Sequence, residues 1–85
     1  MPKMRAKMVV ETVEVYRTAQ GVTAEKIKFR AVAKKDGYPS DGSDENNTYA
    51  KFSPQAHLEI VVANPVLFGQ LNPGEFYYVD FTPAQ

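Results

Sequence analysis

The chain of 85 residues contains no cysteine and no tryptophan, and its only histidine is His57. Without cysteine it has no disulfides, no thiolate metal ligands and no thiol nucleophile. Glu59 is the only acidic partner on the same predicted strand face as His57, and one histidine with one glutamate makes neither a metal site nor an acid–base pair. The sequence also lacks a glycine-rich phosphate loop. We therefore expect no catalytic residue, no cofactor and no metal, and a protein that is not an enzyme.

Long apolar runs are missing too. No segment approaches the roughly 18–20 apolar residues of a membrane span. The basic start of the chain, residues 1–7, is followed only by Met8–Val10 before Glu11 interrupts, whereas a signal peptide needs about 7–15 apolar residues there. We therefore expect no membrane partner and a cytoplasmic location.

Acidic residues are scarce in the first part of the chain and basic residues are scarce in the second. The formal net charge of the whole chain is zero. Residues 1–35 carry nine basic and three acidic residues, a net +6, and residues 36–85 carry one basic and seven acidic residues, a net −6. Such a split indicates either a dipolar surface that binds a charged partner or further copies of the chain, or ion pairs across neighbouring strands.

Apolar and β-branched residues alternate along most of the chain, which is typical of strands. In the first strand the apolar positions change parity, and a β-bulge near Val9–Thr12 restores one continuous apolar face. The clearest alternation places Ile27 and Phe29 on one face and three basic residues on the other. The five predicted strands cover residues 4–17, 24–35, 48–52, 58–63 and 76–81.

One turn of helix is predicted between the last two strands. Asn64 suits the N-cap, Pro65 the first helical position, and Gly69 the left-handed position after the end. Five strands with this turn favour an all-β fold, a single small five-stranded barrel over residues 1–85 with an SH3-like arrangement. An OB-like barrel or a small β-sandwich is the alternative, although an OB-fold places its helix between the third and fourth strands.

A polar segment over residues 36–47 separates the second and third predicted strands. Its composition favours turns and water, and it is longer than a typical hairpin connection. We predict a flexible loop here. A small-ligand-binding protein that uses this loop as a lid is one alternative function, although no phosphate-cradling motif accompanies it.

The fifth predicted strand carries apolar residues on both faces, which suggests contact with a second molecule. Tyrosine and phenylalanine are common anchors of protein interfaces. The predicted protein-interface residues are Phe76, Tyr78, Asp80 and Tyr49.

Basic residues in the second strand support a different alternative, a barrel that binds single-stranded nucleic acid through phosphate contacts and base stacking. Hairpin pairing brings Glu11 and Glu14 close to this strand, so a salt-bridged, solvated face is the competing interpretation. The residues of the nucleic-acid alternative are Lys26, Lys28, Arg30, Lys51 and Tyr49.

Residues 48–84 resemble small proteins of unknown function that tailed bacteriophages encode. The similar parts are the Lys51–Pro54 turn, the Asn64–Pro65 helical turn, and the closing Tyr78–Thr82 strand after Pro73–Gly74. The resemblance implies a phage origin, and hence a virion or the host cytoplasm as the location. It implies no activity and no functional residues.

The leading hypothesis is therefore a non-enzymatic phage accessory protein that acts through protein–protein contacts. Its role would be either structural, as a virion or decoration protein, or inhibitory, against a host protein or a host defence. Self-association is expected, because a basic first half and an acidic second half can complement each other between copies.

Overall fold

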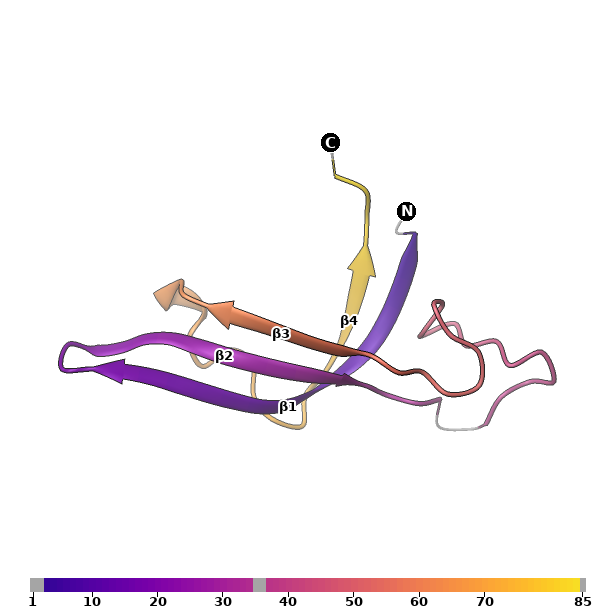
Figure 1. Cartoon of the computed structure of the whole chain (residues 1–85), viewed down its shortest axis with the longest axis horizontal. Helices are drawn as coiled ribbons and strands as arrows, with labels where there is room; N and C mark the ends of the chain where they lie inside the picture. The colour runs from indigo at the N-terminus through magenta and orange to yellow at the C-terminus, as the bar shows by residue number, and fades with distance from the viewer. Residues whose placement is uncertain (1–2, 35–36, 85) are drawn as a thin grey trace.

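The computed structural model of the chain describes residues 3–34 and 37–84. These residues form an antiparallel sheet of four strands with one short 3-10 turn (Figure 1). The strand order is β3–β2–β1–β4, so β3 and β4 are the edges. The elements are β1 (Met4–Thr18), β2 (Gly21–Ala31), β3 (His57–Val62), η1 (Pro65–Leu67) and β4 (Phe76–Phe81).

β1 and β2 form a long hairpin. The turn is at Ala19–Gln20, and the next residue, Gly21, has a φ of +115°, a conformation that glycine adopts without steric cost. The register between the strands shifts between Val10 and Thr12, which confirms the predicted bulge. The bulge moves the apolar face of β1 from even-numbered to odd-numbered positions, so that the same face of the sheet stays apolar on both sides of it.

β1 has two different partners along its length. Residues Met4–Val9 pair with β4, and residues Met8–Thr18 pair with β2. Figure 1 shows that β1 is curved. Its first half and β4 run together at an angle to the hairpin, whereas β3 runs along β2. β3 and β4 therefore remain on opposite edges of an open sheet.

The prediction of an all-β fold is confirmed, but the described residues do not close into a five-stranded barrel. The missing strand is the one predicted at residues 48–52. Ala50 N–H donates to the carbonyl of Asn47 at 3.1 Å, as in a turn, and Phe52 has a φ of +67°. A left-handed backbone at Phe52 is incompatible with an extended strand. The second strand also ends earlier than predicted, at Ala31.

The predicted helical turn is present as the 3-10 turn η1. The side chain of Asn64 accepts a hydrogen bond from Val66 N–H at 3.3 Å, Pro65 is the first residue of the turn, and Gly69 has a φ of +78°. Behind η1, the carboxylate of buried Glu25 on β2 accepts from Gly69 N–H at 3.1 Å. This bond fastens the connection between β3 and β4 to the apolar face of the sheet.

The core occupies one face of the sheet and is small. Its buried cluster comprises Ala6, Met8, Val10, Ile27 and Phe29. Residues of the connecting segments and of both edge strands pack against this cluster but remain partly exposed. The hydrophobic free energy of folding scales with the apolar area removed from water, so this sheet is stabilised by fewer buried side chains than a closed barrel of its length.

Asn47 ties the segment after β2 to the sheet. Its side chain is completely buried, with 0% exposure. Its Oδ1 accepts from the backbone N–H of Lys7 at 2.9 Å, and its Nδ2 donates to the carbonyl of Val32 at 2.9 Å and to Asp44 Oδ2 at 3.1 Å. The side-chain amide of Asn47 thus provides the hydrogen-bond partner for a backbone group of β1, at Lys7, and for one of the segment after β2, at Val32. Within the predicted loop of residues 36–47, Asp44 and Asn47 are buried, Asp36 lies outside the described residues, and mobility stays a prediction.

Replacing Asn47 with alanine is expected to lower the free energy of unfolding by about 2–3 kcal/mol, because the Lys7 N–H and the Val32 carbonyl lose their buried partner. Urea denaturation measures the change. Asn46→Ala is the matched control, since its side chain makes one exposed contact, with the Tyr78 hydroxyl. Equal losses for the two variants would contradict the role assigned to Asn47.

Candidate protein interface

Edge strand β4 presents Phe76, Tyr78 and Asp80 on the face opposite to the core. Alternation along the strand directs Tyr77 and Val79 toward the core cluster and these three residues away from it. Phe76 is 60% exposed and Tyr78 is 54% exposed. The structure thus brings three of the four predicted interface residues together on one strand.

β1 places a cation against each of these side chains. Arg5 lies opposite Asp80, with Nε 2.7 Å from Oδ1 and Nη2 3.1 Å from Oδ2. The same guanidinium stands 4.5 Å from the ring centroid of Tyr78, and Lys7 Nζ lies 5.5 Å from the ring centroid of Phe76. These cation–π contacts cover one face of each ring. The rings are therefore held in place and are not free to stack on both faces.

The ion pair shifts the pKa values of both its members. The hydrogen bond from Arg5 lowers the pKa of Asp80 below its ordinary value of 3.8, and the bond to Asp80 raises the pKa of Arg5. Because the two side chains are 40% and 36% exposed, solvent screens the pair and its contribution to stability is modest. The main consequence of the pair is that the only charge within β4 is neutralised.

Tyr49, the fourth predicted interface residue, lies apart from the other three. It packs against the core cluster, on the other face of the sheet. Its hydroxyl is buried and has no hydrogen-bond partner within residues 3–34 and 37–84, and burial raises its pKa above 10.0. With residues such as Met4 and Phe81 it lines an apolar notch of about 180 Å³ between β4 and the start of β3. Tyr49 therefore does not extend the β4 surface.

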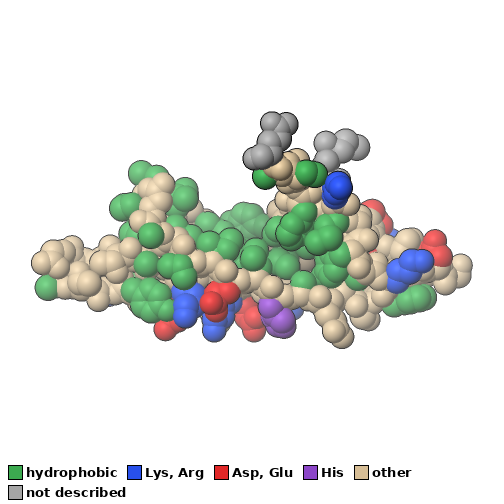
Figure 2. Space-filling model, turned by 45° about the horizontal axis from the view of Figure 1, so that its top comes forward, with side chains coloured by type: hydrophobic (Ala, Val, Ile, Leu, Met, Phe, Trp, Pro, Cys, Tyr) green, Lys and Arg blue, Asp and Glu red, His purple; other side chains and the backbone are tan. Residues whose placement is uncertain are grey.

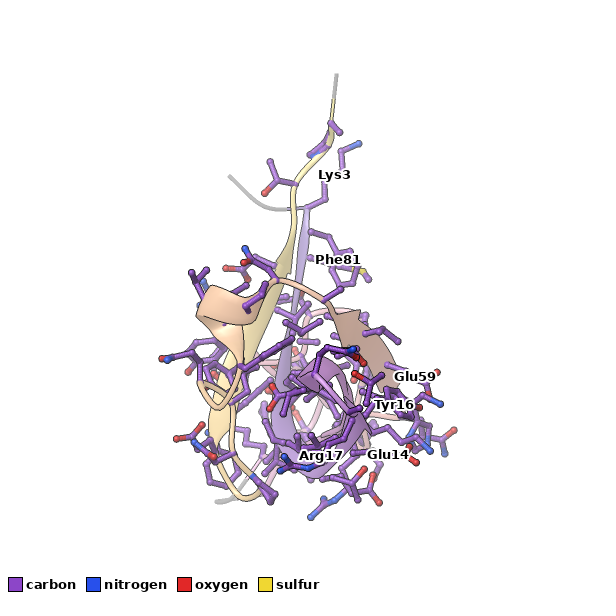
Figure 3. All side chains as sticks on the ribbon, turned by 90° about the vertical axis from the view of Figure 1, so that its left-hand side faces the viewer. Lys3, Glu14, Tyr16, Arg17, Glu59 and Phe81 are labelled. Carbon is purple, nitrogen blue, oxygen red and sulfur yellow. The ribbon has the colours of Figure 1, made fainter. Side chains whose placement is uncertain are left out.

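The basic residues of β2 lie on one face of the strand, beside acidic residues of the neighbouring strands. Lys26 lies opposite Glu14 in the hairpin register, and Lys28 Nζ lies 3.9 Å from Glu59 Oε1 on β3. Figure 3 shows Glu14, Tyr16 and Glu59 on one side of the molecule. Arg30 lies on the same face of β2 by alternation.

Two residues of the same alternative, Tyr49 and Lys51, lie in the segment that connects β2 to β3. Tyr49 packs on the core side of the sheet, away from the β2 row. The structure therefore brings Lys26, Lys28 and Arg30 together on β2 and places Tyr49 and Lys51 elsewhere, and nucleic-acid binding stays a prediction.

Two exposed apolar residues were not predicted from the sequence. Alternation directs Ile60 and Phe81 toward the core face, yet they are 43% and 46% exposed. Val61 lies on the outer face of β3, where its 56% exposure agrees with the alternation. Figure 2 shows apolar side chains gathered in the hollow beside the raised part of the sheet and charged side chains along the opposite margin. The alternation identified the faces correctly, but only the open shape of the sheet reveals that the ends of the apolar face stay uncovered.

No group of three or more His, Asp or Glu side chains among the described residues is placed to hold a metal ion. In the same part of the chain, no helix has the length and apolar character needed to cross a membrane.

Comparisons with protein-family models, with curated proteins and with solved structures return no match for this chain. The resemblance to small phage proteins therefore stays a prediction.

Replacing Arg5 with methionine is expected to raise the pKa of Asp80 toward its ordinary value, which an NMR titration of the side-chain carboxyl measures. A carboxyl with a lowered folded-state pKa adds stability above its unfolded pKa, and that stability is lost as the pH falls through the folded pKa. The stability difference between wild type and Arg5→Met should therefore shrink as the pH falls below 3.8. Lys28→Met is the control and should leave the Asp80 titration unchanged; an unchanged titration in Arg5→Met would refute the pairing.

Proposed function

We propose that this chain is a non-enzymatic accessory protein that acts through protein–protein contacts, with further copies of itself among its partners. The observation that carries the proposal is the amount of apolar surface that the chain leaves exposed. Among the described residues, eleven large apolar side chains are exposed, and Figure 2 shows apolar side chains gathered in the hollow of the sheet. A contiguous exposed apolar patch marks a site of interaction.

The shape of the chain supports the same proposal. Its Cα radius of gyration is 15.5 Å, with extents of 55 × 32 × 16 Å. A compact domain of this length has a radius of gyration of about 12 Å. The thin, elongated sheet leaves two edge strands and part of the apolar face for a partner to cover.

The charge split contributes less than the apolar surface. The ion pairs Arg5–Asp80, Lys28–Glu59 and Lys34–Glu45 each join the basic first half to the acidic second half within one chain. These ion pairs thus cancel part of the charge asymmetry between the two halves within the chain itself. We expect association to rest mainly on apolar and backbone contacts, which salt does not screen.

The resemblance to tailed-phage proteins supplies the proposed setting, a virion or the host cytoplasm. A structural or decoration protein would be recovered with purified particles, whereas an inhibitor of a host protein or a host defence would remain in the soluble fraction of infected cells. Both roles use the same means, contact with another protein.

Size exclusion with light scattering tests the proposal on the wild-type chain at 50 and 500 mM salt. We expect a molar mass that is a multiple of 9.5 kDa at both salt concentrations, because the proposed contacts are largely apolar. Dissociation only at 500 mM salt would assign the association to the charge split instead. A mass of 9.5 kDa at both salt concentrations would contradict self-association.

A further inference from the structure

We propose that β4 is the contact strand between two copies of this chain. The outer edge of β4 pairs antiparallel with the same edge of a second copy, about a two-fold axis at Tyr78. Two four-stranded sheets then become one continuous sheet of eight strands. This inference rests on the proposed function and specifies both the partner and the strand that binds it. The contact is isologous, because the same residues lie on both sides of the axis.

The free backbone groups of β4 belong to alternate residues. Val10 N–H donates to the carbonyl of Glu75 at 2.9 Å, and in an antiparallel ladder residues bonded to one neighbour alternate with residues that face the other side. Odd-numbered residues of β4 therefore bond to β1, and the N–H and C=O groups of Phe76, Tyr78 and Asp80 point outward. With the axis at Tyr78, Phe76 of each copy pairs with Asp80 of the other, and every outward group gains a partner.

β4 carries few of the features that protect edge strands from pairing. It contains no lysine and no proline, its register with β1 is unbroken, and its single charge is held by Arg5. β3 also lacks lysine and proline. Its outward-facing residue Glu59, however, would oppose a second carboxylate if β3 paired with itself about that position. β1 beyond Val10 has two register irregularities.

The charges around β4 complement one another in this register. Asp80 of the second copy lies directly opposite Phe76 on the same face of the sheet. Lys7 stands over the ring of Phe76, so the incoming carboxylate meets an ammonium group. Each Asp80 would then lie between its own Arg5 and the Lys7 of the other copy, and the two-fold axis repeats this arrangement. No like charges face each other across the contact.

The open sheet leaves more surface exposed than a compact chain would. It exposes 6125 Å² of accessible surface, whereas a compact monomer of this mass exposes about 5,000 Å². The outer edge of β4 is part of the surface that an association between copies would cover.

A single introduced cysteine tests the contact, because the chain has none of its own. Residues directly opposite in a hydrogen-bonded antiparallel pair have Cα atoms about 5.5 Å apart, within the range of about 4.4–6.8 Å that a disulfide spans. Tyr78→Cys should form a disulfide dimer at least about tenfold faster than Val61→Cys at micromolar concentration, because pairing raises the effective concentration of the thiols. Val61 is the matched control, being 56% exposed and outward-facing on β3.

A second pair of variants tests the register. Phe76→Cys mixed with Asp80→Cys should cross-link the two proteins, whereas either variant alone should cross-link slowly, since residue 76 then faces no thiol. Equal rates for Tyr78→Cys and Val61→Cys, together with no cross-linking in the mixture, would overturn the β4 contact. If light scattering still showed an oligomer, the proposed function would stand with a different interface; a monomer in light scattering would overturn both.

Discussion

The pairing of β1 with two different strands determines the rest of the structure. Its first half forms a ladder with β4 and its second half with β2, and the bulge between Val10 and Thr12 lies where one partner gives way to the other. Bulges bend a strand and increase its twist. The bend lifts β4 away from the hairpin, so the chain builds a curved, open sheet. The buried cluster, the uncovered ends of the apolar face and the free outer edge of β4 all follow from this one strand.

Features encoded by neighbouring residues were predicted well from the sequence. The long hairpin, the bulge and the capped turn at Asn64–Pro65 depend on alternation, parity and turn chemistry within a few residues, and all are present. Closure of the sheet depends on contacts between distant segments, and it was predicted wrongly. Residues 48–52 alternate like a strand, but the buried amide of Asn47 and the left-handed backbone of Phe52 hold them in turns.

The candidate interface was partly predictable for the same reason. Alternation alone places Phe76, Tyr78 and Asp80 on one face, and the structure agrees. The alternation of residues 48–52 predicts a strand with Tyr49 facing outward, whereas the structure packs Tyr49 on the core side. The cations that cover the β4 rings come from β1, far away in sequence, and no local pattern reveals that Arg5 and Lys7 lie beside Tyr78 and Phe76.

Amide hydrogen exchange shows whether the outer edge of β4 pairs with a second copy, as we propose. Tyr78 N–H points away from β1 and has no partner among the residues that the structure describes, so it exchanges slowly only if a second copy bonds to it. At high protein concentration, Tyr78 N–H should be protected to nearly the same degree as Val79 N–H, which bonds to β1. Exchange of Tyr78 N–H as fast as that of Val61 N–H on the outer edge of β3, at every protein concentration, would contradict this pairing.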